Sequence, residues 1–143
     1  MHLTSDTLKI VSLVPSASEI ICDLGLEQYL VGVSHECNYP ISLRNIDSVT
    51  LSNIDSSKAQ IEIDNAVRKK VEENLPLYEV KIDKINQLEP DVIITQGVCD
   101  VCAISSNQVE VMLKGQLCTF HQLQKYFLSM VDHLMLFVMI SLC

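Results

Sequence analysis

A chain of 143 residues with 48% apolar, 5% aromatic and 20% charged side chains has the composition of a single packed domain, which excludes disordered and low-complexity classes. Its 18 acidic and 10 basic residues give a net charge of -8, and a field of that sign repels nucleic acid and anionic membrane surfaces. We therefore expect a soluble globular domain without a nucleic-acid partner.

The two ends of the sequence show no pattern for export or membrane insertion. Residues 1–7 lack the basic start and the long apolar stretch of a secretory signal. The apolar run at residues 134–143 is about half as long as a helix that spans a bilayer. The sequence as it stands predicts a cytoplasmic location and no membrane span. A true start further upstream would instead predict a periplasmic or cell-surface location.

The first predicted elements are a buried strand and a helix. Residues 9–14 form a short apolar, partly β-branched run that Pro15 ends, which is typical of a buried strand. Ser16 and Glu19 have the spacing of a capping box, which predicts a helix that begins there and ends at Gly25. The apolar residues expected to face the sheet from this helix are Ile20, Ile21 and Leu24.

A second strand is predicted at residues 29–34, and a polar loop at residues 35–40 follows it. Residues 41–56 are rich in Ser, Asn and Asp without a clear period, so we expect an irregular connection with at most a short helix at residues 41–44. In residues 57–74 the apolar positions fall on one helical stripe, which predicts the longest helix.

The pattern of strands and helices then continues. A strand is predicted at residues 77–80, a short helix at residues 82–88 and a strand at residues 91–95. A second polar loop, at residues 96–102, follows that strand, and a helix is predicted at residues 105–114.

Residues 115–143 have a different character. They contain no Pro, have no Gly after residue 115 and are dense in Leu, Met and Phe. We expect an atypical apolar tail, for which an additional helix is the predicted structure.

Strands that alternate with helices predict an α/β domain with a mainly parallel sheet and right-handed connections. In such sheets, ligands bind beyond the carboxyl ends of the strands. Both polar loops, at residues 35–40 and 96–102, follow strands and are therefore expected at that edge.

Three blocks of the sequence resemble one known family. They are residues 10–20 (IVSLVPSASEI), residues 32–40 (GVSHECNYP) and residues 96–103 (QGVCDVCA). In this order they resemble class III periplasmic substrate-binding proteins, the receptors for cobalamin and iron chelates of ABC importers, and in particular a cobalamin-binding-like subgroup.

The resemblance covers residues 8–114 and implies a fold and a function. Proteins of this family have two α/β lobes joined by a long helix, with the ligand held between them. The chain would then hold only the N-terminal, Rossmann-like lobe, with the second lobe missing. The resemblance implies a ligand-binding module that is not an enzyme and requires no cofactor. Its partners would be a corrinoid or metal chelate, and an ABC-transporter permease or a second lobe.

Candidate site residues lie in the polar loops and at the start of the first helix. His35 is a candidate to offer its imidazole to the metal of a corrinoid or iron chelate, and Glu36, Tyr39 and Gln96 are candidates for polar contacts. Ser16 and Ser18 are placed to donate hydrogen bonds at the helix N-terminus. The full set of predicted ligand-binding residues is Pro15, Ser16, His35, Glu36, Cys37, Tyr39, Gln96, Cys99, Asp100 and Cys102.

The cysteines leave other interpretations open. His35, Cys37, Cys99 and Cys102 together have the ligand types of a tetrahedral Zn²⁺ site, provided that the second and fourth predicted strands are neighbours. Cys99 and Cys102 also have the spacing of a redox-active dithiol, although Asp100 between them disfavours a thiolate. The competing function is therefore a cytosolic thiol-based metal-binding or redox protein. The simplest alternative is that His35 and Cys37 are ordinary loop residues.

Overall fold

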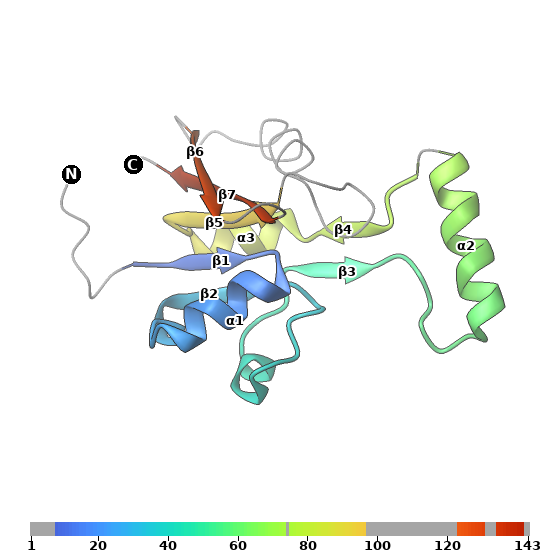
Figure 1. Ribbon diagram of the computed structural model, residues 1–143, viewed down its shortest axis with the longest axis horizontal. Coiled ribbons are helices and arrows are strands. Elements are labelled where there is room, and N and C mark those ends of the chain that lie inside the picture. Colours follow the sequence, from blue (N-terminus) through green and yellow to red (C-terminus); the bar gives the residue numbers. More distant parts are fainter. Residues whose placement is uncertain (1–7, 74, 97–122, 131–133, 142–143) are drawn as a thin grey trace.

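The structure is a computed structural model that describes residues 8–73, 75–96, 123–130 and 134–141, the last two ranges as backbone. A three-stranded parallel sheet lies at its centre, with helices on both faces (Figure 1). The strands are β1 (Ile10–Ser12), β2 (Leu30–Val33), β3 (Thr50–Ser52), β4 (Tyr78–Val80), β5 (Val92–Gln96), β6 (Leu123–Met130) and β7 (Leu134–Ser141). The helices are α1 (Pro15–Asp23), α2 (Gln60–Glu72) and α3 (Ile82–Leu88), with short 3₁₀ turns at Glu27–Tyr29 and Ile41–Asn45.

The central strands run in the order β2-β1-β5, and all three are parallel. Both faces of β1 are buried, because Val11 belongs to the apolar cluster under α3 and Ile10 to the cluster under α1. Strands covered on both faces read as continuous apolar runs, which is how β1, β2 and β5 were predicted. The described part is therefore mixed α/β with a small parallel sheet between helices.

Helix α1 begins differently from the prediction. Val14 is its N-cap in extended conformation, Pro15 occupies the first turn, and no side chain caps the helix. The capping box expected from Ser16 is therefore wrong, because a Pro at the first helical position already lacks the N–H group that a cap would satisfy. The end of the helix is as predicted, since Gly25 follows it with a φ of 72°.

The buried face of α1 is also narrower than predicted. Ala17, Ser18 and Ile21 form the side that packs on the sheet, whereas Ile20 and Leu24 are 37% and 67% exposed. Positions three and four apart share a helix face, so Ile21 continues the side begun by Ala17 and Ser18. Ile20 lies beside that face, and Leu24 is the C-cap residue after the last turn. Only Ile21 of the three predicted contacts is confirmed.

Residues 41–56 contain a strand that the sequence analysis did not predict. The short helix there is confirmed as the 3₁₀ turn, but Thr50–Ser52 form β3, which pairs antiparallel with β4. Just before β3, Val49 N–H donates to the Val33 carbonyl at 2.9 Å and Val33 N–H donates to the Asp47 carbonyl at 3.0 Å. These bonds tie the start of the β3–β4 ribbon to the end of β2.

Helix α2 confirms the predicted long helix but packs unlike the others. It stands apart from the sheet beyond the β3–β4 ribbon (Figure 1), and none of its residues is buried. Its charges face solvent, as in the Arg68–Asp64 ion pair of 3.1 Å.

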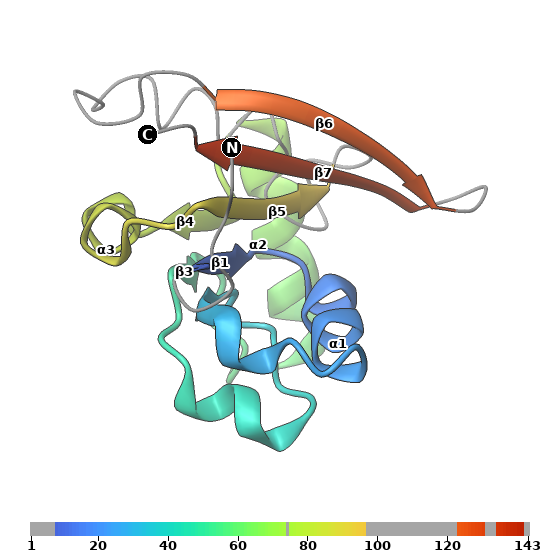
Figure 2. The same ribbon diagram turned by 90° about the vertical axis from the view of Figure 1, so that its left-hand side faces the viewer.

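The helix expected in the apolar tail is wrong in the described part of residues 115–143. β6 and β7 form an antiparallel hairpin, and β7 pairs antiparallel with β5 from Val92↔Ile140 to Gln96↔Leu136 (Figure 2). A short apolar run does not distinguish a strand from a buried helix, and here the edge of β5 supplies the partner. The sheet thus has the order β2-β1-β5-β7-β6, parallel in one half and antiparallel in the other, rather than mainly parallel.

Candidate functional site

The carboxyl ends of β1, β2 and β5 lie at the same edge of the sheet, as expected for parallel strands. The loop of residues 35–40 leaves this edge from β2. One expectation is corrected: β2 and β5 are not neighbours, because β1 lies between them. Two strand spacings separate the two ends by roughly 10 Å, which a shared set of metal ligands would have to bridge.

His35 is the best-defined polar residue at this edge. It is half-buried, and its backbone N–H donates to the Thr50 hydroxyl at 2.9 Å. Its ring nitrogen Nδ1 lies 2.7 Å from the same Thr50 oxygen. Two contacts to one hydroxyl fix both the backbone and the imidazole of this loop residue.

The β3–β4 ribbon supplies the surroundings of the imidazole. Thr50 pairs with Val80 and Ser52 pairs with Tyr78, so Thr50 and Tyr78 are diagonal neighbours on one face of the ribbon. The Tyr78 ring lies against His35, with ring centroids 5.5 Å apart and planes inclined at 44°. The ribbon therefore forms one wall of the site, and the loop after β2 forms the other.

The electrostatic environment favours the neutral imidazole. Partial burial lowers the pKa of His35, because it penalises the charged ring, and the Lys81 ammonium acts in the same direction. The neighbouring Glu36 carboxylate opposes this shift but does not reverse it. A neutral imidazole is the form that can give a nitrogen lone pair to a metal ion.

Cys37 follows in the same loop but has a different environment. It is buried in the apolar cluster under α1, and its sulfur lies 3.1 Å from the Ser18 hydroxyl. Burial raises the pKa of the Cys37 thiol, and the contact with the Ser18 hydroxyl offsets only part of that effect. Cys37 is therefore a protonated thiol in the core, whereas metal ligation requires a thiolate.

Ser18 is likewise committed to internal contacts. It is fully buried, and its hydroxyl donates to Ser12 Oγ at 2.9 Å or to the Val14 carbonyl at 3.3 Å. The prediction that Ser18 donates to a ligand is therefore wrong. Pro15 and Ser16, in the first turn of α1, are half-exposed and remain candidates.

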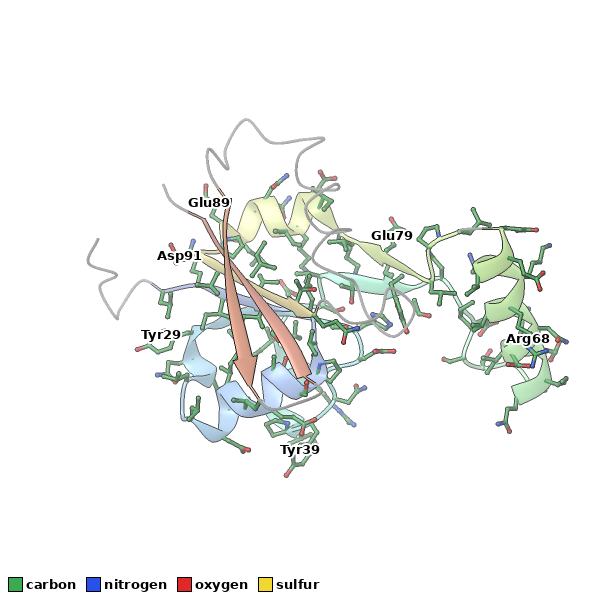
Figure 3. All side chains as sticks on the ribbon, turned by 45° about the horizontal axis from the view of Figure 1, so that its top comes forward. Tyr29, Tyr39, Arg68, Glu79, Glu89 and Asp91 are labelled. Carbon is green, nitrogen blue, oxygen red and sulfur yellow. The ribbon has the colours of Figure 1, made fainter. Side chains whose placement is uncertain are left out.

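The other predicted contacts divide into exposed and half-buried groups. Glu36 and Tyr39 are exposed, Tyr39 by 71%, and Figure 3 shows the Tyr39 side chain projecting from the surface. The Tyr39–Pro40 peptide bond is cis. Gln96 is half-buried at the end of β5, on the far side of β1 from His35.

The second predicted loop gives no test of the cysteine site. Cys99, Asp100 and Cys102 lie outside the described residues. Within the described ranges, no three His, Cys, Asp or Glu side chains are grouped so that they could hold a metal ion. The four-ligand Zn²⁺ site stays a prediction.

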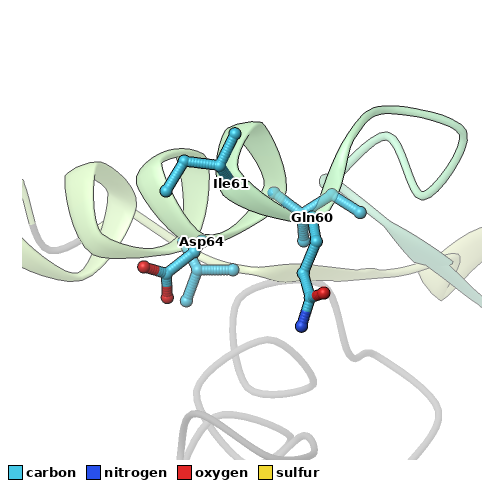
Figure 4. Close-up of a pocket in the computed structure, with 5 residues that line it drawn as sticks. Gln60, Ile61 and Asp64 are labelled. Carbon is cyan, nitrogen blue, oxygen red and sulfur yellow. The ribbon is translucent and has the colours of Figure 1, made fainter.

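Two surface hollows lie elsewhere. One, of about 620 Å³, runs along α2 and is lined by Gln60, Ile61 and Asp64 among others (Figure 4). The other, of about 570 Å³, lies where β4 meets α3, around Lys81 and Gln87. Neither of the two includes a predicted ligand-binding residue.

The residues that surround His35 could not be predicted from the sequence. Thr50 and Tyr78 belong to a ribbon of which only β4 was predicted, and Ser34 was read as part of a strand. The alternation of Val49, Thr50 and Leu51 was the available signal for β3, because β-branched residues favour strands.

Comparisons with protein-family models, with curated proteins and with solved structures found no match for this chain. In the described ranges, no helix has the length and apolar character needed to cross a membrane.

Proposed function

We propose that this chain is a non-enzymatic ligand-binding module, similar to the Rossmann-like N-terminal lobe of class III substrate-binding proteins, and that its ligand is a corrinoid or another metal chelate. The observation that carries the proposal is the imidazole of His35, which is held by Thr50 at the carboxyl edge of a parallel sheet. This edge is where open α/β sheets bind ligands. One of the three sequence blocks that resemble the family, residues 32–40, contains this loop.

The proposed role of His35 is to donate a nitrogen lone pair to the metal of the ligand. Glu36 and Tyr39 are exposed next to it and would contact polar groups at the rim of the ligand. Gln96, across β1, would contact the opposite side, since a corrin ring is wide enough to cover more than one strand end. Binding would be reversible, with no bond of the ligand cleaved.

A partner surface would complete the cleft. Tyr39 and Ile41 are 71% and 72% exposed beside the site, although side chains of this kind usually lie inside proteins or at interfaces. We propose that a second lobe or a transporter permease covers them when the ligand is held.

The alternative, a thiol-based metal-binding or redox protein, receives less support. It gains nothing from Cys37, whose thiol is buried, hydrogen-bonded to Ser18 and raised in pKa. Its metal-binding form therefore depends on His35, Cys99 and Cys102, and its redox form on Cys99 and Cys102 alone.

A titration with aquocobalamin tests the proposal. Purified, reduced protein is titrated at pH 8, and the corrin absorption bands are followed. We expect a saturable spectral change in the wild type and its loss in His35→Ala. His121→Ala is the matched control, because it also removes one histidine.

The outcomes separate the candidate functions. No spectral change with folded wild-type protein would overturn corrinoid binding by this chain. A change of equal size in His35→Ala would overturn the role of the imidazole. Reduction of two Co(III) corrinoids to Co(II) for each disulfide formed between Cys99 and Cys102, with release of two protons, would favour the thiol-based alternative.

A further inference from the structure

The Thr50 hydroxyl has a single proton but lies within hydrogen-bond distance of three groups. A threonine hydroxyl offers one proton and two lone pairs. Three groups lie within reach of Thr50 Oγ1: the His35 backbone N–H at 2.9 Å, the Ser34 hydroxyl at 3.3 Å and His35 Nδ1 at 2.7 Å. Because the hydroxyl has only one proton, the group that receives this proton determines whether Nδ1 accepts or donates a hydrogen bond.

The backbone N–H of His35 can only donate, so it occupies one lone pair of Thr50. The Thr50 hydroxyl donates its proton to Ser34 Oγ, which also accepts the Glu36 N–H at 3.4 Å. With the hydroxyl proton directed at Ser34, the second lone pair of Thr50 is left for Nδ1, which then donates its own hydrogen atom to Thr50. Thr50 is fully buried, so water is not at hand to replace any of these partners.

We infer that Thr50 is a positioning residue whose hydroxyl holds His35 in the Nδ1–H tautomer and leaves the Nε2 lone pair for the metal of a ligand. No described residue forms a hydrogen bond with Nε2. A hydrogen bond to one ring nitrogen commonly fixes the tautomer and orientation of a histidine whose other nitrogen binds metal. The tautomer follows from the hydrogen-bond geometry alone, whereas its use in binding rests on the proposed function.

The tautomer can be measured without any ligand. In ¹⁵N-labelled protein of residues 1–143 at pH 8, long-range ¹H–¹⁵N correlation spectra distinguish a protonated from an unprotonated ring nitrogen. The signals of His35 are assigned as those lost in His35→Ala. We expect protonated Nδ1 and unprotonated Nε2 in the wild type, a shift towards the Nε2–H tautomer in Thr50→Val, and the wild-type pattern in Thr50→Ser.

A wild-type spectrum with protonated Nε2 would overturn the inference, because the hydroxyl would then donate to Nδ1. The wild-type spectrum needs no variant, so it identifies the tautomer of His35 even if Thr50→Val fails to fold. Thr50→Ser keeps the hydroxyl and controls for loss of the methyl group.

Corrinoid affinity gives the second readout. We expect Thr50→Val to weaken aquocobalamin binding about tenfold or more, the usual effect of losing a partner that orients a metal ligand, and Thr50→Ser to retain most of it. Unchanged affinity in Thr50→Val, with binding still dependent on His35, would overturn the positioning role only. Wild-type protein with the expected tautomer and no corrinoid binding would overturn the proposed function and leave the tautomer assignment standing.

Discussion

The sulfur of Cys37 lies 3.1 Å from the hydroxyl oxygen of Ser18, and this contact joins the loop after β2 to helix α1. Both residues are buried. Two residues earlier, His35 is held by Thr50 from the other side. The loop that carries the candidate ligand residues is therefore fixed at two points, which favours a site that is formed before the ligand arrives.

Substitution of Ser18 by Ala should lower the free energy of unfolding by about 1–3 kcal/mol, because Ser12 and Cys37 lose a buried hydrogen-bond partner. Urea unfolding followed by circular dichroism measures the change. Ser56→Ala is the matched control at an exposed serine, where a change within about 0.5 kcal/mol is expected. Equal stability of the two variants would show that the Ser18 contacts do not stabilise the fold.

Cys37 should resist thiol reagents in the folded protein. Its side chain is 5% exposed and its pKa is raised by burial, so little thiolate reaches solvent. Pulse labelling at pH 8 with mass spectrometry should leave Cys37 unmodified, whereas labelling in urea should modify it fully. Rapid modification under native conditions would contradict the burial of this thiol and favour a thiol-based function.

The depressed pKa of His35 predicts how stability depends on pH. The folded state binds its proton less readily than the unfolded state, whose histidine titrates near 6.5. Between 6.5 and the lower folded pKa the unfolded state holds more protons, so the free energy of unfolding decreases as pH falls through this window. Above pH 6.5, the contribution of the neutral His35 to the free energy of unfolding is fully present.

An NMR titration of the His35 ring should give a midpoint below 6.5. Thermal melts between pH 7 and pH 5 should show a steeper loss of stability in the wild type than in His35→Gln, which cannot titrate. A midpoint above 6.5 would mean that the Glu36 carboxylate outweighs burial and Lys81.

Gly32 should not tolerate a side chain. A Cβ atom there would lie 2.8 Å from Val49 Cγ1, 3.0 Å from Leu88 Cδ1 and 3.2 Å from Val11 Cγ2. Gly32→Ala should therefore lower the free energy of unfolding by about 1–3 kcal/mol through overpacking.

Gly25→Ala is the informative comparison, because nothing lies within 4 Å of a Cβ atom at that position and only its φ of 72° opposes the change. We expect Gly25→Ala to lower the free energy of unfolding by about 1 kcal/mol. Thermal melts of both variants measure the difference, and a neutral Gly32→Ala would contradict the close packing of β2 against Val49 and Leu88.

The fold could be predicted where local pattern and final structure agree. Helix α3 has the predicted bounds, Ile82–Leu88, because Ile85 gives it a buried face and Pro90 prevents its continuation. The runs that form β1, β2 and β5 are apolar because both faces of these strands are covered. In each case the local sequence is enough to predict where the helix or strand lies.

The missed features depend on partners distant in the chain. The strand at Thr50 has three residues and is defined by its pairing with β4. The tail becomes β6 and β7 because β5 offers an open edge, which no local pattern records. In the site, the His35 loop was predicted, but its Thr50 contact spans 15 residues and required the fold to be known.

We propose above that His35 gives a ring nitrogen to the metal of a corrinoid. Electron paramagnetic resonance of cob(II)inamide bound to the protein tests it most directly, because this corrinoid lacks its own axial base. We expect superhyperfine splitting from one axial nitrogen, a changed pattern with ¹⁵N-histidine labelling, and loss of the splitting in His35→Ala but not in His121→Ala. A cobalt signal without nitrogen coupling, recorded with folded wild-type protein and saturating cob(II)inamide, would contradict it.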